Sequence, residues 1–159
     1  MALFTATFGA VAVSAAQDVF ELVTAASTRV ALWEIRLGQY SDAGDAAAEM
    51  ISLQVLRGYT VSGSGGSAVV PEKVEPWGAA ATSTVEANNT TVANTTTPAL
   101  LLADSFNIQA GFLWQKQERS TLLVPASTRL VVRITLPADA LTMNGTLVFE
   151  EFNTGPYAA

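Results

Sequence analysis

The chain consists of short segments in which apolar residues recur at every second position, with turn-forming residues between them. Such segments span residues 3–13, 18–24, 29–38, 48–60, 99–104, 110–116, 120–124, 129–136 and 145–152. Side chains of a strand alternate between its two faces, so this period places one apolar face against a core. A series of short strands of this kind predicts an all-β chain, an antiparallel β-sandwich or barrel, in a single domain of residues 1–159.

The alternation also predicts which side chains share a face of each strand. In the first segment it places Phe4 and Phe8 on one face and Val11 and Val13 on the other. In residues 29–38 the apolar face contains Ala31, Trp33, Ile35 and Leu37. In residues 48–60 one face contains Ile51, Leu53 and Val55, and near the end of the chain one face contains Leu147, Phe149 and Glu151.

Turn signals stand between several of these segments. The tetrapeptide Ala-Ser-Thr-Arg occurs at residues 26–29 and again at residues 126–129. Because Ser and Thr hydroxyls stabilise tight turns, we expect equivalent turns at the two copies. These turns predict hairpins at residues 24–29 and 124–129. Chance repetition is an open alternative, because the chain is rich in Ala, Ser and Thr. Asn144-Gly145 is a strong hairpin signal, because a type I′ turn needs positive φ at both central residues.

Two stretches depart from the strand pattern. The sequence SDAGDAAAEMISL, residues 41–53, favours at most one helical turn before a strand, since alanine is the best helix former. Residues 61–98 are rich in Gly, Pro, Ser and Thr and too long for a hairpin connection, so we expect a long irregular arm with a flexible tip at residues 62–67. An extended arm through Pro71 and Pro76 should follow this tip, and a Thr-rich strand or edge is expected around residues 82–97.

Composition excludes several functions. The chain has no cysteine and no histidine, which removes thiol and Ser-His catalysis, zinc-cysteine sites and the commonest metal ligand. The eight Lys and Arg residues are scattered and the net charge is -6, which argues against nucleic-acid binding. No apolar run is long enough to span a membrane, and no Lys or Arg precedes Arg29 as a signal peptide would require. We expect no enzymatic activity and no catalytic, cofactor or metal site.

Four segments together resemble a known group of proteins. They are TATFGAVAVSAAQDVFEL, SDAGDAAAEMISLQVLRG, STVEANNTT and ADALTMNGTLVFEEF. In this order they are similar to head decoration, or cement, proteins of tailed bacteriophages. The resemblance implies a β-sandwich of jelly-roll type that forms homotrimers on the outer capsid surface, where it binds the major capsid protein. It places the protein in the virion, after assembly in the host cytoplasm.

The candidate partner surface is extended, low in charge and poorly explained by a compact monomer. It combines the N-terminal strand with the first part of the arm, and its predicted contact residues are Phe4, Phe8, Val69, Val70, Pro71, Pro76 and Trp77. Trp77 either folds back onto its own domain or anchors a partner. The alternative function is a carbohydrate- or receptor-binding β-sandwich module of a phage tail fibre or a secreted adhesin, because one fold hosts many functions.

Overall fold

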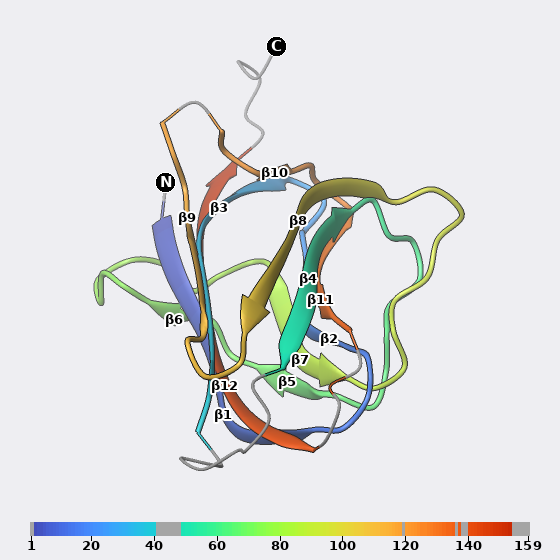
Figure 1. Cartoon of the computed structure of the whole chain (residues 1–159). Helices are drawn as coiled ribbons and strands as arrows, with labels where there is room; N and C mark the ends of the chain where they lie inside the picture. Colours follow the sequence, from blue (N-terminus) through green and yellow to red (C-terminus); the bar gives the residue numbers. More distant parts are fainter. Residues whose placement is uncertain (1, 41–48, 119, 136, 138–139, 154–159) are drawn as a thin grey trace.

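The computed structural model describes residues 2–40, 49–118, 120–135, 137 and 140–153, and contains two antiparallel six-stranded sheets packed face to face (Figure 1). The predicted all-β sandwich is therefore confirmed. The helical turn predicted within residues 41–53 falls mainly on positions 41–48, which lie outside the described residues. Met50 begins a strand, as the apolar alternation after that point predicts.

The first sheet has the strand order β10-β3-β12-β1-β6, and β9 also pairs with β3. Its strands are β1 (Ala2–Val13), β3 (Thr28–Gln39), β6 (Glu72–Lys73), β9 (Phe112–Gln115), β10 (Leu123–Val124) and β12 (Leu141–Asn153). The second sheet has the order β5-β7-β2-β11-β4-β8. Its strands are β2 (Gln17–Val23), β4 (Met50–Arg57), β5 (Ser67–Val69), β7 (Thr84–Asn89), β8 (Ala99–Asn107) and β11 (Arg129–Ile134).

Without β5, β6 and β7, the first sheet has the order β1-β12-β3, and β9 and β10 both pair with β3. The second sheet then has the order β2-β11-β4-β8. The first and last strands, β1 and β12, pair with each other in the first sheet, and the connections cross repeatedly between the two sheets. This is the topology of a jelly roll, in which two interleaved Greek keys form two facing sheets. The three remaining strands belong to one insertion between β4 and β8, residues 58–98, which we call the insertion.

The insertion contains three short strands within the long, largely irregular segment that its composition predicts. β5 pairs with β7, β7 pairs with β2, and β6 pairs with β1, so the insertion extends both sheets. The strand expected within residues 82–97 is confirmed as β7. The predicted flexible tip at residues 62–67 is wrong, because Ser64 and Thr91 exchange two backbone hydrogen bonds of 2.9 Å.

The core lies between the two sheets and consists of their inward-facing apolar side chains. The largest fully buried ones are Phe4, Phe20, Phe149, Leu22, Leu32, Ile35, Ile51, Leu53, Ile108, Leu130, Ile134 and Leu141. Burial of each contributes roughly 1.5–3 kcal/mol. The predicted alternation is confirmed in β4, where Ile51, Leu53 and Val55 are fully buried and Met50 is exposed.

A β-bulge changes the phase of β1. Phe8 pairs with Gly145 and Val11 pairs with Met143, so Gly9 and Ala10 together stand opposite one residue of β12. Ala10 adopts a positive φ of 55°, and its N–H donates a 2.8 Å hydrogen bond to Oδ1 of Asn144. The extra residue turns Val11 and Val13 toward the same core as Phe8. The prediction that they face the opposite side is therefore wrong.

A second bulge displaces Trp33 from the core. Val148 pairs with Glu34 and Phe149 pairs with Leu32, which leaves Trp33 as the unpaired extra residue of β3. Leu32 takes the inward position, and Trp33 is 38% exposed. Its indole N–H donates to Glu150 and its ring lies 4.0 Å from the ammonium of Lys116. The prediction that Trp33 shares the inward face with Ile35 is wrong for this reason.

The two Ala-Ser-Thr-Arg copies form turns, but not hairpins. The first connects β2 to β3 and the second connects β10 to β11, so each crosses from one sheet to the other. The two turns bind each other: the Thr24 hydroxyl accepts from the Thr128 N–H at 3.0 Å, and the Ser127 N–H donates to the Ala25 carbonyl. Equivalent turns were predicted, and the structure places them side by side.

Asn144 and Gly145 lie within β12, so the hairpin predicted there is wrong. β12 pairs with β1 on one side and with β3 on the other across this point. The Asn144 side chain caps the bulge of β1, and Gly145 faces the ring of Phe8 so closely that a Cβ would overlap it. Strand pairing on both sides therefore overrides the local turn preference.

Replacing glycine by alanine should change the stability of the fold differently at two positions of paired strands. Gly145→Ala should destabilise the fold by about 1–3 kcal/mol, because its Cβ would displace the Phe8 ring from a packed core. Gly38→Ala, on the adjacent strand β3, meets no atom within 4 Å and should leave stability unchanged or slightly raised. Urea denaturation of both variants measures the difference, and equal midpoints would contradict this account of Gly145.

Candidate partner-binding surface

Three buried carboxylates lie among the described residues, and each accepts hydrogen bonds from backbone N–H groups of the insertion. Asp18 accepts from Ala93 at 2.7 Å, and Glu21 accepts from Gly63 at 2.8 Å. Glu151 accepts from Thr82 at 3.1 Å and from Ser83 at 2.7 Å. These contacts fasten the insertion to both sheets, so we call Asp18, Glu21 and Glu151 the anchor carboxylates.

Asp18 forms the most complete of these contacts. The Arg133 guanidinium donates to both carboxylate oxygens, at 2.6 and 3.2 Å, and donates again to the Ala93 carbonyl at 3.0 Å. Charge-assisted, two-point contacts of this kind are among the strongest hydrogen bonds in proteins. Arg133 and Asp18 therefore join β11, β2 and the insertion in one network on the outer face of the second sheet.

Burial and charge also shift pKa values in this network. Burial by itself would lower the pKa of Arg133, but the hydrogen bond and charge of Asp18 outweigh it, so the pKa is raised. The adjacent Tyr59 ring lies 5.3 Å from that guanidinium, and burial raises the pKa of its hydroxyl. Both groups keep their protons at neutral pH, which fits a structural role.

Glu21 forms the second anchor in the same layer. Its carboxylate also accepts from the Asn89 side chain at 2.9 Å and lies 3.3 Å from Nε of Arg129. Arg129 in turn donates to the Ser62 hydroxyl and to the Thr60 carbonyl. Sequence reasoning missed these contacts, although the signal was present: Asp18 and Glu21 interrupt an otherwise apolar strand, and Glu151 shares an inward face with Phe149.

Removing one member of the Asp18–Arg133 pair should leave an uncompensated charge beneath the insertion. Asp18→Asn should destabilise the fold by about 3 kcal/mol, and adding Arg133→Met should cost less than the sum of the two single changes. Denaturant unfolding of all four forms measures the coupling. Asp104→Asn on β8 is the matched control, since Asp104 is exposed, and an equal effect of both Asp→Asn changes would contradict the anchor role.

The structure separates the predicted contact residues into two groups. Phe4 and Phe8 are 1% and 9% exposed and belong to the core, so their assignment to a partner surface is corrected. The other five lie in the insertion, where Val70 and Trp77 are 74% and 82% exposed and Pro76 is also exposed. Val69 and Pro71 are half-buried.

The exposed part of the insertion, residues 70–80, forms an arm that leaves the body of the molecule beside β6 (Figure 1). Backbone pairing holds it: β6 pairs with β1, and the Val74 N–H donates to the Leu3 carbonyl at 3.0 Å. At its tip, Gly78 N–H donates to the Glu75 carbonyl and the Lys73 ammonium donates to the Gly78 carbonyl at 2.8 Å. The arm is thus an ordered, largely apolar projection.

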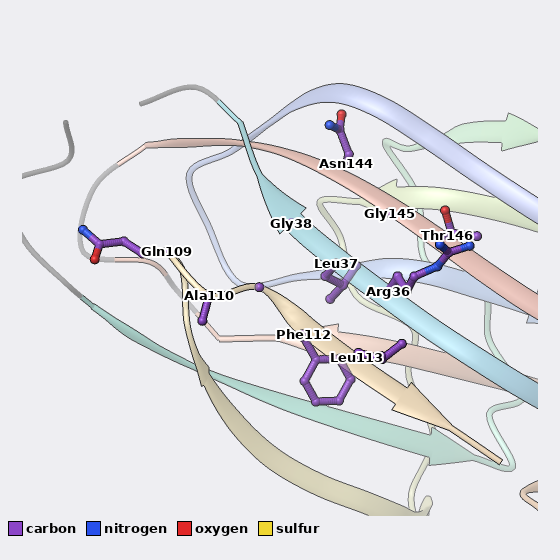
Figure 2. A pocket seen from close by; sticks show the side chains of 11 residues that line it. Arg36, Leu37, Gly38, Gln109, Ala110, Phe112, Leu113, Asn144, Gly145 and Thr146 are labelled. Atoms are coloured by element: carbon purple, nitrogen blue, oxygen red, sulfur yellow. The ribbon is translucent and has the colours of Figure 1, made fainter. Parts of the chain in front are cut away.

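A hollow of 440 Å³ lies on the first sheet where β9 joins β3, and Figure 2 shows the side chains around it. Arg36, Gln109, Asn144 and Thr146 supply polar groups, and Gly38 leaves space because it has no side chain. Phe112 contributes an aromatic ring, but it is only 9% exposed. The hollow therefore offers no open ring on which a sugar could stack.

A second, more apolar pocket of 330 Å³ lies at the corner where β10, β12 and the start of β3 meet. Its lining residues are Arg29, Arg57, Leu123, Val124, Pro125 and Phe152. The Arg57 guanidinium donates to the Leu123 carbonyl at 2.6 Å, which fixes its position in the lining. This pocket was not predicted, because its residues come from four separate strands and one turn.

Potential metal ligands do not cluster among the residues that the structure describes. No group of three or more His, Cys, Asp or Glu side chains there could hold a metal ion. The same residues include no helix of the length and apolarity needed to cross a bilayer.

Comparison with known proteins gives little further information. No family model matches the chain, and no curated protein matches it. Among solved structures, a match was found to the VP16-VP17 complex, a complex of the two major capsid proteins of bacteriophage P23-77. The identity is 11%, the match covers 92% of this chain and 89% of that chain, and the TM-score is 0.20. A TM-score this low does not establish a shared fold.

Proposed function

We propose that this chain is a structural protein of a bacteriophage virion, a head decoration protein that binds the outer surface of the capsid and stabilises the head. The observation that carries the proposal is the arm, an apolar segment that projects from a jelly roll in which the anchor carboxylates hold the insertion in place. Exposed large apolar side chains on one segment mark interaction sites. The resemblance of four segments to decoration proteins supports the same function.

Such a protein acts by mass action and requires no catalytic group. If it binds the assembled shell but not the free subunits, its binding free energy stabilises the shell, and many copies add many such contributions. The proposed partner is the major capsid protein, the proposed location is the capsid surface, and the proposed assembly is a homotrimer. The arm supplies apolar area for these contacts at low entropic cost, because its backbone is already ordered.

Binding to capsids tests this function directly. We expect the purified chain to cosediment with expanded heads made from the major capsid protein encoded in the same genome. Val70→Asp combined with Val74→Asp should weaken this binding about 10- to 100-fold, because both exposed side chains would carry charge into an apolar contact. Neither change should alter folding, since both side chains are more than half exposed.

Leu113→Asp is the matched control, because Leu113 is 59% exposed but lies at the hollow of the first sheet. Binding should survive this change. Loss of binding with Leu113→Asp alone would move the contact to the hollow. Failure of the unmodified chain to bind expanded heads, together with binding to a glycan array, would replace the decoration function by the carbohydrate-binding alternative.

A further inference from the structure

The tip of the arm has the properties of a ligand for an apolar pocket. Trp77 is 82% exposed, the highest value among the exposed large apolar side chains of the described residues. The Gly78 N–H closes the turn by donating to the Glu75 carbonyl, and the Lys73 ammonium donates to the Gly78 carbonyl, so the turn loses less conformational freedom on binding. Tryptophan is enriched among the residues that dominate binding energy at protein interfaces.

The corner pocket has complementary properties. Leu123, Val124, Pro125 and Phe152 give it an apolar lining, and Leu123 is 47% exposed. Its volume of 330 Å³ is in the range of pockets that hold small ligands. Its two polar side chains are arginines, whose planar guanidinium groups stack favourably on an indole ring.

The arm tip and the pocket carry opposite charges. Glu75 stands two residues before Trp77, whereas Arg29 and Arg57 line the pocket and no acidic side chain of the described residues does. Within the described part of the chain, neither Glu75 nor Arg29 takes part in an ion pair. An arm tip entering the pocket would bring Glu75 toward the arginines, and opposite charges in register favour correct docking.

We propose that the arm tip of one copy, with Trp77 at its end, binds the pocket formed by Leu123, Pro125 and Phe152 on a second copy of this chain. Donor and acceptor are different surfaces, so the contact is heterologous and closes into a ring when the rotation between copies permits. The two surfaces are neighbours on each copy, because Phe152 also lines the recess that contains Ala79 and Ala80 at the root of the arm.

This contact extends the proposed function by naming the occupant of the pocket, and its test needs the purified chain alone. Sedimentation velocity over a range of concentrations should show reversible self-association. Trp77→Ala should raise the dissociation constant by roughly 30-fold, the effect of losing a dominant interface residue. Leu113→Ala, which removes a similarly exposed apolar side chain from another surface, should have no effect.

Exchanging the charges of Glu75 and Arg29 tests whether these two side chains pair across the contact. Glu75→Arg and Arg29→Glu should each weaken self-association, and the two changes together in one chain should restore it. Both side chains are exposed, so thermal unfolding should be unchanged in all three variants. Single variants that weaken association without rescue in the double variant would overturn the pairing of these residues.

Three other outcomes would overturn the proposal. The first is an unmodified chain that is monomeric at every concentration. The second is a Trp77→Ala variant that self-associates normally but no longer binds heads, which would assign the arm tip to the capsid protein. The third is normal self-association of a Leu123→Asp variant, which would exclude the corner pocket as the acceptor. Head binding that persists in a monomeric chain would leave the decoration function intact.

Discussion

The packing of the insertion against the two sheets depends on three buried carboxylates that accept hydrogen bonds from its backbone. Taking an ionised carboxylate out of water costs several kcal/mol, and this cost is offset only by well-placed donors and opposite charge. Asp18, Glu21 and Glu151 obtain these from backbone N–H groups of the insertion and, for the first two, from Arg133 and Arg129. The jelly roll and its insertion therefore stabilise each other.

This mutual dependence has a structural consequence for the arm. β2 is buried on both faces, by the core on one side and by the insertion on the other, and the insertion cannot shift without exposing the anchor carboxylates. The same insertion carries Val70, Val74 and Trp77 outward. A base held by hydrogen bonds thus presents an apolar projection, and such preorganisation lowers the entropic cost of binding a partner.

The strand pattern predicted much of the fold correctly and failed at identifiable points. The two-residue period predicted the faces of β4 and β12, including the inward position of Glu151. It failed for Val13 and Trp33, because a bulge in each strand shifts the phase by one residue. The bulge near Ala10 is capped by Asn144, which is 134 positions away in the sequence, so no local window contains its cause.

The sequence by itself determined that the chain forms paired strands around an apolar core, because the two-residue period decides which side chains share a face of a strand. It also excluded chemistry by His or Cys side chains of this chain, because the sequence contains neither residue. Tertiary structure alone decided that Phe4 and Phe8 are core residues while Trp77 is exposed, and that the Ala-Ser-Thr-Arg turns pack together. It alone created the corner pocket, whose lining comes from Arg29, Arg57, Leu123 and Phe152. Such sites depend on which strands become neighbours, and that choice minimises the free energy of the whole chain rather than of any segment.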